Sequence, residues 1–218
     1  MDLGRICALL QPFLTGAAVS GEKVGCLPES QLQRFAKYLD LLLMWNEKVN
    51  LTAVRDPDEI VTRHFGESLF LGRQLFPSGY EKNDRLVDFG SGAGFPGVPI
   101  KLWAPSIRLN LVESNNKKAI FLREVIRALE LKDAEVFSRR AESFSWQAEV
   151  VTMRAVERFD CALPIGIQLV APGGRIALLI GEPQIRPTHE LAREISWDSP
   201  IPVPQSESRV ALIGRKPE

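Results

Sequence analysis

The residues best suited to do chemistry lie in a glycine-rich stretch, Arg85-Leu-Val-Asp-Phe-Gly-Ser-Gly-Ala-Gly-Phe-Pro-Gly97. Its apolar start predicts a buried strand, which carries Asp88 near its end and is followed by Gly90, Gly92 and Gly94. Glycine has no Cβ and adopts positive φ without strain, so such a loop lets a ligand approach the backbone closely. The stretch therefore indicates a ligand-binding corner where a strand ends.

The spacing of the glycines distinguishes between nucleotide-binding patterns. The G-x-G-x-x-G fingerprint of dinucleotide-binding proteins fails because Phe95 stands third after Gly92, and the Gly-Lys-Ser/Thr of a P-loop is absent. The remaining D-x-G-x-G-x-G pattern is typical of the S-adenosylmethionine (SAM) loop of Rossmann-like methyltransferases. Taken alone, the loop has an alternative interpretation as a plain turn between a strand and a helix.

A second candidate is Glu113, which ends the strand predicted over residues 107–113. A carboxylate at the tip of the second strand of such a fold is placed to accept hydrogen bonds from both ribose hydroxyls of an adenosine ligand. The alternatives are a solvated strand end or a cap for the following helix. Because the glycine loop precedes it at the right distance, we expect the ligand role.

The elements that must position these residues alternate from residue 85 onward. The apolar patterns predict strands near 85–90, 107–113, 133–138, 148–153, 174–180 and 208–215, and helices over 97–103, 115–130 and 157–170. This alternation predicts an α/β fold with a mainly parallel sheet. Together with the glycine loop, it resembles the Rossmann-like, class I SAM-dependent methyltransferase fold. That fold implies a mainly parallel, seven-stranded sheet with an antiparallel last strand, of which the patterns identify six strands. A Pro-rich, hairpin-like segment at 199–204 precedes the last strand, and we expect a short turn rather than a helix there.

Upstream, the sequence predicts an N-terminal helical extension over residues 1–80, and residues 81–218 form the SAM-binding core. Helices are expected over 3–14, 28–48 and 56–75, the last opened by Asp56 as N-cap, Pro57 at the first position and Glu59 at N3. The apolar stripe of the second helix is interpreted as core packing.

Composition narrows the class of protein. The 218 residues carry 27 Lys and Arg against 27 Asp and Glu, so no global charge points to non-specific nucleic-acid binding. Cys7, Cys26 and Cys161 show no metal spacing and are expected to be inert thiols in a reducing cytoplasm. No metal site, membrane span or signal peptide is expected.

Several motifs occur in the order found in one family. They are Trp45-Asn46, Asn50-Leu51-Thr52, Arg63-His64, Asp88-Phe-Gly-Ser-Gly-Ala-Gly-Phe-Pro-Gly97, Val112-Glu113-Ser114, Lys117-Lys118, Phe121-Leu122, Arg140-Ala141-Glu142 and Arg154-Ala155. Together they resemble the ribosomal RNA small subunit methyltransferase G family, also called glucose-inhibited division protein B. The match spans residues 38–181.

The resemblance implies SAM-dependent methylation of N7 of one guanine of 16S rRNA, in the decoding-region loop of the small ribosomal subunit. The residues it implies for cofactor binding are Gly90, Gly92, Gly94, Phe95, Glu113, Ala141, Glu142 and Arg154. Within this set, Glu113 would hold the ribose, and Ala141 and Glu142 would lie against the adenine edge. Guanine N7 carries a lone pair and no proton, so we expect positional catalysis and name no catalytic base.

Three residues are candidates on the substrate side. Arg154 would bond guanine O6, a phosphate or the SAM carboxylate, or form a salt bridge with Glu142 or Glu157. His64 is interpreted either as a substrate contact or as a packed structural residue, and Asn50 either as a site residue or as a turn cap.

Two departures from the family pattern affect this site. Met153 stands before Arg154 where a small hydroxyl residue is expected, and Ile180-Gly181 stands where the family has Lys-Gly. The loss of that lysine removes an expected contact with RNA and leaves the cofactor site intact.

Further basic residues predict a patch that contacts RNA phosphates, with solvated helix faces as the alternative. They are Lys117, Lys118, Arg123, Arg127, Arg139, Arg140, Arg154 and Arg158. The expected partner is 16S rRNA within the assembled small subunit, and the expected state is a monomer. Two other functions remain open: SAM-dependent methylation of a small molecule or protein, and a SAM-binding, non-catalytic module of ribosome assembly.

Overall fold

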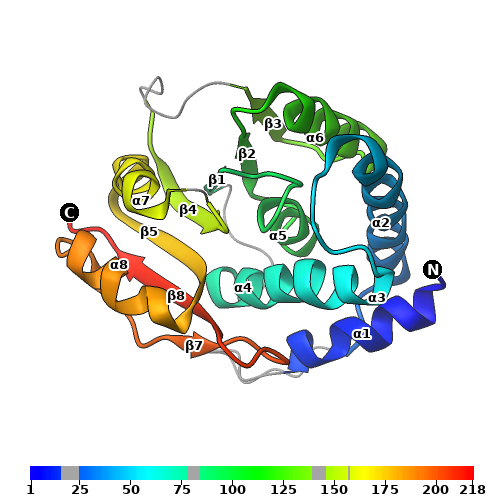
Figure 1. Cartoon of the computed structure of the whole chain (residues 1–218), viewed down its shortest axis with the longest axis horizontal. Coiled ribbons are helices and arrows are strands. Elements are labelled where there is room, and N and C mark those ends of the chain that lie inside the picture. Colours follow the sequence, from blue (N-terminus) through cyan, green and yellow to red (C-terminus); the bar gives the residue numbers. More distant parts are fainter. Residues whose placement is uncertain (16–24, 78–83, 139–145, 157) are drawn as a thin grey trace.

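The computed structural model of the protein describes residues 1–15, 25–77, 84–138, 146–156 and 158–218 (Figure 1). The first part of the chain is helical. Its elements are α1 (Leu3–Thr15), α2 (Glu29–Val49), α3 (Pro57–Ile60), a π-helical turn η1 (Val61–Gly66) and α4 (Glu67–Leu75). The last three form one continuous helix over the predicted range. Its predicted start is confirmed, because the Asp56 side chain accepts a hydrogen bond from the Glu59 N–H at 2.8 Å.

Strands and helices then alternate as the sequence predicts. They are β1 (Arg85–Phe89), α5 (Gly97–Trp103), β2 (Arg108–Val112), α6 (Asn116–Ala128), β3 (Ala134–Phe137), β4 (Ala148–Arg154), α7 (Phe159–Gln168), β5 (Val170–Gly181), η3 (Glu182–Gln184), α8 (Ile185–Leu191), β6 (Ser196–Trp197), β7 (Ile201–Pro202) and β8 (Arg209–Arg215).

The strands form one sheet in the order β3-β2-β1-β4-β5-β8-β6, with β7 paired to β8. The pairs from β3 to β5 are parallel, and β8 is antiparallel to β5. The expected class of sheet with its antiparallel last strand is confirmed. Among the described residues the sheet has eight strands rather than seven, because the segment before β8 supplies the two-residue strands β6 and β7.

Helices cover both faces of the sheet, and alternate residues of each strand enter different cores. Leu86 and Val150 pack into the cluster formed with α1, α2, α4, α5 and α6, whereas Val87 and Val151 pack with α7 and α8 (Figure 1). Both faces of these parallel strands are therefore buried. The polar loops that carry chemistry are left at the strand ends.

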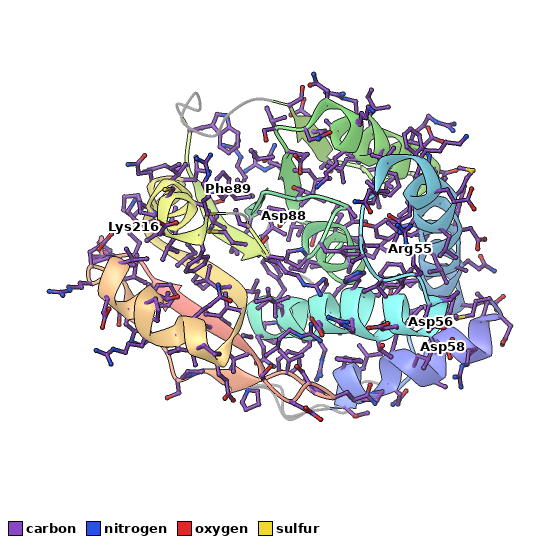
Figure 2. The ribbon with its side chains drawn as sticks, in the orientation of Figure 1. Arg55, Asp56, Asp58, Asp88, Phe89 and Lys216 are labelled. Carbon is purple, nitrogen blue, oxygen red and sulfur yellow. A yellow bond between two sulfur atoms is a disulfide. The ribbon has the colours of Figure 1, made fainter. Side chains whose placement is uncertain are left out.

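The N-terminal helices pack on the α/β core through its helices, with α4 against α5 and α2 against α6. One apolar cluster contains Phe35 and Tyr38 of α2 together with Phe95 and Val98. At the far end, Arg5 of α1 forms an ion pair with Asp58 of α3, which lies where these helices meet (Figure 2). The division at residue 80 stays a prediction.

The expectation of a turn rather than a helix before the last strand is wrong, because helix α8 lies between β5 and β8. Pro183 lies in the single turn η3 and Pro187 in the first turn of α8. A proline in a first turn costs no intrahelical hydrogen bond, so it does not prevent the helix. The Pro-rich segment 199–204 contains β7, which pairs with β8 and so forms one arm of a hairpin with it.

The expectation of inert thiols is wrong for two of the three cysteines. Cys7 in α1 and Cys26 before α2 form a disulfide with a Cα–Cα distance of 6.0 Å, and Cys161 is free and exposed. The pairing follows from the packing of α1 beside α2, which a sequence separation of 19 residues does not reveal. Within the described part of the chain, no helix combines the length and the apolar character that crossing a membrane requires.

Candidate functional site

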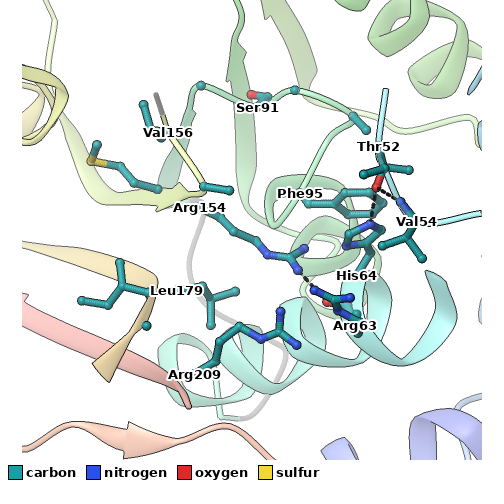
Figure 3. Close-up of a pocket in the computed structure, with 18 of the residues that line it drawn as sticks. Thr52, Val54, Arg63, His64, Ser91, Phe95, Arg154, Val156, Leu179 and Arg209 are labelled. Atoms are coloured by element: carbon teal, nitrogen blue, oxygen red, sulfur yellow. Dashed lines mark hydrogen bonds between the residues drawn. The ribbon is translucent and has the colours of Figure 1, made fainter. Parts of the chain in front are cut away.

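A pocket of about 490 Å³ opens at the carboxyl ends of β1, β4 and β5, where ligands bind in folds of this type (Figure 3). The glycine loop, the segment after α2 and the turn η1 form part of its wall, and the ends of β4, β5 and β8 form the rest. Its lining residues include 51–54, Arg63, His64, 90–93, Phe95, 153–156, 179–181 and Arg209.

The glycine loop is held by the end of the neighbouring strand β2. The N–H groups of Gly90 and Ser91 both donate to the carbonyl oxygen of Val112, at 2.9 and 3.0 Å. The N–H of Gly92 donates to the Glu113 carboxylate at 2.9 Å, and the other carboxylate oxygen accepts from the Asn115 N–H at 2.7 Å. Glu113 therefore lies against the loop with a fixed orientation, although it is not part of the pocket lining.

Asp88 anchors the same loop from below, in the interior of the molecule (Figure 2). One carboxyl oxygen accepts from the Gly97 N–H at 3.1 Å and the other from the Thr152 hydroxyl at 3.0 Å. Burial raises the pKa of Asp88 to about 7, against the opposing effect of these hydrogen bonds. The residue joins β1, β4 and the start of α5, so its role is to fix the loop.

Helix α2 supports the loop from the other side. The buried hydroxyl of Tyr38 donates a hydrogen bond to the carbonyl oxygen of Ala93, and its ring packs between those of Phe65 and Phe95. Gly94 has φ +93°, and a Cβ there would lie 2.5 Å from the Tyr38 hydroxyl oxygen. Gly94 thus permits a close contact with α2 and is not among the pocket-lining residues.

His64 is held by a chain of contacts that starts in α2. The side chain of Asn46 makes two 2.9 Å hydrogen bonds to the backbone N–H and carbonyl of Thr52. The Thr52 hydroxyl then lies 2.8 Å from Nε2 of His64, whose ring stacks on Phe95 with 4.8 Å between centroids. The motif residues Asn46 and Thr52 therefore fix the orientation of an imidazole in the pocket wall, and Figure 3 shows the contact between Thr52 and His64.

The charge state of His64 follows from its surroundings. Burial and the positive charges of Arg154, Arg63 and Arg209 lower the pKa of His64 to about 3, and a backbone contact with Arg63 opposes this only weakly. The imidazole is therefore neutral near pH 7. It serves as a hydrogen-bonding and stacking group rather than as a cation.

Arg154 has a partner that the sequence did not suggest. Its Nη2 donates to the Glu67 carboxylate at 3.0 Å and to the carbonyl oxygen of Arg63 at 2.7 Å. The second carboxylate oxygen of Glu67 lies 2.7 Å from Nη2 of Arg209. Burial lowers the pKa of Arg154 and raises that of Glu67, while the opposite charges of the pair act against both shifts. Glu67 thus bridges two arginines beneath the pocket.

The predicted site residues are brought together in part. Gly90, Gly92, Phe95, His64 and Arg154 line one pocket. Asn50 instead ends α2 with φ 51° and accepts a hydrogen bond from Arg55 at 3.4 Å. Ala141 and Glu142, with Arg139, Arg140 and Glu157, lie outside the described residues. No cluster of potential metal ligands occurs in the described ranges.

Some residues of the predicted basic patch already form contacts within the protein. On α6, Arg127 forms an ion pair with Glu124, and Arg123 donates to the Ser138 hydroxyl at 3.1 Å. Lys117 at the start of α6 and Arg158 at the start of α7 are exposed. The patch stays a prediction.

Sequence reasoning missed Glu67, Arg209, Tyr38 and Asn46 as parts of the site. Asn46 lay within a recognised motif, which could have marked it. Glu67 and Arg209 carry no local signal, because the contacts depend on how α4 and β8 meet β4. Of the two departures, Met153 is accommodated by Gly166 of α7, where a Cβ would lie 2.6 Å from the Met153 sulfur.

The residues present fit SAM. At Gly92, in the pocket wall, an added Cβ would meet nothing nearer than the Gly90 carbonyl oxygen at 3.8 Å, so open space adjoins the loop backbone. Phe95 and Ala93 give the wall an apolar surface, and the fixed carboxylate of Glu113 lies next to the loop. An adenosine with an amino-acid tail needs these features of a pocket.

Fold and pocket together define a methyltransferase of the Rossmann-like, SAM-dependent class. Solved structures with the same fold include magnesium protoporphyrin IX methyltransferase from Synechocystis PCC 6803 with bound SAM, at TM-score 0.63 and 10% identity, covering 82% of this chain and 97% of that one. Ribosomal protein L11 methylase from Lactobacillus delbrueckii subsp. bulgaricus has TM-score 0.59 and 12% identity, covering 71% and 79%.

The family follows from closer matches. The family model described as rRNA small subunit methyltransferase G matches residues 31–208. Relatives named ribosomal RNA small subunit methyltransferase G are 41% identical in Chloroflexus aggregans, over 86% of this chain and 82% of that one, and 36% identical in Xanthomonas axonopodis pv. citri, over 94% and 96%. The chain belongs to the rRNA small subunit methyltransferase G family, which confirms the resemblance and the class of enzyme.

Proposed function

We propose that this protein transfers a methyl group from SAM to N7 of one guanine of 16S rRNA within the small ribosomal subunit. Family membership supports the reaction and the class of substrate. The observation that carries the proposal is the composition of the pocket: a glycine loop forms part of its wall, and Arg63, Arg154 and Arg209 supply positive charge for a nucleic-acid substrate.

We assign the cofactor to the wall formed by the glycine loop. Gly90, Gly92 and Phe95 would contact it, and Glu113 would accept hydrogen bonds from its ribose, with two oxygens already oriented by the N–H groups of Gly92 and Asn115. Ala141 and Glu142 remain the proposed adenine contacts. When bound, SAM supplies an electrophilic methyl group attached to a sulfonium.

The protein's own contribution is positional. Guanine N7 is an in-plane lone pair with no proton, so no side chain has to act as a base. His64, the only histidine among the described residues of the pocket wall, is neutral and forms a hydrogen bond with Thr52. Its ring stacks on Phe95, and the two rings form a flat surface beside the glycine loop. Holding the guanine base and the methyl group in line lowers the activation barrier by several kcal/mol. Effective-molarity estimates for well-oriented groups begin at about 7 kcal/mol.

The test is transfer of a labelled methyl group from SAM to three substrates offered in parallel: hypomethylated small subunits, naked 16S rRNA and a metabolite pool. We expect label in the small subunits, recovered as 7-methylguanosine after digestion. Label confined to the metabolite pool would contradict the RNA substrate, and SAM binding without transfer to any of the three would favour a non-catalytic assembly module.

We further propose that the protein acts as a monomer in the cytoplasm, where assembled small subunits are found. Sedimentation of the purified protein across a concentration series tests the first part. A single species with the mass of one 24.3 kDa chain is expected, and a concentration-dependent increase in mass would contradict it.

A further inference from the structure

Three arginines converge at one end of the pocket, and their surroundings separate them into two roles (Figure 3). The side chain of Arg154 is only 10% exposed, and its Nη2 is shared between Glu67 and the carbonyl oxygen of Arg63. The side chains of Arg209 and Arg63 are 27% and 43% exposed. Arg154 therefore forms the buried floor of the pocket, whereas the guanidinium groups of Arg209 and Arg63 are accessible to a ligand.

The charge around this cluster is not balanced inside the pocket. Among the described residues that line it, three are arginines and none is Asp or Glu. Glu67 is 2% exposed and lies behind the floor, where it neutralises one charge, and Glu59 pairs with Arg63 on the outer surface of the helix. In addition, Nε of Arg63 and Nε of Arg209 are buried without a hydrogen-bond partner.

Sheet register explains how Arg209 reaches this place. In the antiparallel pair of β5 and β8, Arg209 lies opposite Gly181, and the neighbouring Ile180 also lines the pocket. Strand β8 thus places the positively charged side chain of Arg209 beside Ile180 of β5.

The chemistry of the cluster selects an anion. SAM carries a single carboxylate besides its positive sulfonium, whereas RNA carries one phosphate for each nucleotide and so offers several anionic groups to a cluster of arginines. A guanidinium fork matches phosphate oxygens with two parallel hydrogen bonds. We infer that Arg63 and Arg209 form a phosphate-binding site that takes the RNA backbone next to the target guanosine, above a floor made by Arg154 and Glu67.

This inference rests on the proposed function, because it names the part of the substrate bound at the same pocket. Its first test is the salt dependence of RNA binding by wild type and Arg63→Gln, with SAM present. Loss of one phosphate contact should make the slope of log K against log salt shallower by about 0.7 to 0.9. Binding at 0.1 M salt should weaken by roughly tenfold, since a charge-assisted hydrogen bond is lost.

The matched control is Arg186→Gln on α8. Arg186 also pairs with a glutamate four residues away, Glu190, but its side chain is 88% exposed and does not line the pocket. We expect wild-type slope and affinity for this variant. An unchanged slope in Arg63→Gln, or an equal change in both variants, would overturn the inference.

Arg209 needs a variant that respects its buried partner, because a neutral residue would leave Glu67 with one cation fewer. Arg209→Lys keeps the charge and removes the fork, so RNA binding should weaken while the salt slope stays near the wild-type value. SAM affinity, measured by calorimetry, should be unchanged in both arginine variants. Weakened SAM binding with normal RNA binding would assign the cluster to the cofactor carboxylate and overturn the inference.

The methyl-transfer assay separates this inference from the proposed function. If wild type labels RNA and Arg63→Gln keeps its salt slope, only the phosphate site fails. If wild type labels no RNA but Arg63→Gln still shows the shallower slope, the phosphate site stands and the proposed reaction fails.

Discussion

Tyr38 donates its hydroxyl hydrogen bond to the backbone carbonyl of Ala93, 55 residues further along the chain in the glycine loop. Tyr38 belongs to the helical N-terminal segment, whereas Ala93 lines the pocket of the methyltransferase core. The hydroxyl satisfies a loop carbonyl that the sheet does not reach. The shape of the glycine loop therefore depends on a helix outside the α/β alternation.

Replacing Tyr38 by Phe tests this dependence, because it keeps the stacked ring and removes only the hydroxyl. We expect a loss of about 1 kcal/mol of unfolding free energy, the usual net value of one buried hydrogen bond. SAM affinity should fall as well, since the Ala93 carbonyl loses its partner. Trp197→Phe is the control: it keeps an aromatic ring and removes the indole N–H that donates to the Ala192 carbonyl at 3.1 Å, away from the pocket, so it should also cost stability and leave SAM affinity intact.

Two glycines of the loop should respond differently to alanine. At Gly94 a Cβ would lie 2.5 Å from the Tyr38 oxygen and 2.9 Å from Val98, at φ +93°. At Gly92, with φ +57°, the Cβ would enter open space. Gly94→Ala should therefore unfold the protein at much lower denaturant concentration, while Gly92→Ala costs only about 1 kcal/mol of backbone strain.

SAM affinity should be reduced more by Gly92→Ala than by Gly94→Ala. The added methyl of Gly92→Ala projects into the pocket, so SAM affinity measured on the folded protein should drop well below that of wild type. Equal denaturation midpoints for the two variants would contradict the packing role assigned to Gly94.

Two buried groups should make opposite contributions to the pH dependence of the unfolding free energy. Asp88 has its pKa raised from 3.8 to about 7, so the folded state holds a proton that the unfolded state loses. Its contribution to the unfolding free energy falls as pH rises from about 4 to 7, by up to about 1.4 kcal/mol per pH unit. His64 has its pKa lowered from 6.5 to about 3, so its contribution rises with pH up to about 6.5 by a similar amount.

Single substitutions should expose each contribution. In Asp88→Asn, stability relative to wild type should increase with pH between about 4 and 7, because the opposing contribution of Asp88 is gone. In His64→Gln, stability relative to wild type should decrease with pH between about 4 and 6.5. Urea unfolding at several pH values in this window measures both, and parallel curves for a variant and wild type would refute the shift assigned to that residue.

Asn46 should act on the site through Thr52 and His64. Asn46→Ala removes two 2.9 Å hydrogen bonds, so we expect a loss of roughly 2 kcal/mol in unfolding free energy. The His64 imidazole resonances should shift because Thr52 is no longer fixed, and methyl transfer should slow. Gln33→Ala, which removes an exposed 3.1 Å bond on the same helix, should leave both unchanged.

The sequence predicts those features of the fold and site that depend on neighbouring residues in the chain. The Asp56 cap, the strand that leads into Gly90 and the carboxylate of Glu113 were all predictable, because spacing and residue type decide them within a few positions. The partner of Arg154 was not, since Glu67 is 87 residues away and reaches it only through the packing of α4 against β4. Arg209 likewise depends on the register of β8, which apolar alternation leaves undetermined.

The π-helical turn Val61–Gly66 sets a constraint on the length of the chain. It lies between α3 and α4 without a break and carries Arg63 and His64 into the pocket. In an α-helix each residue turns the next by about 100°, so removing a residue between His64 and α4 would rotate the Arg63 and His64 side chains away from Phe95 and Arg154. The helix should accept many substitutions on its outer face, yet a one-residue deletion should remove the site while leaving the helix in place. The length of this segment is therefore as much a part of the site as Arg63 and His64 themselves.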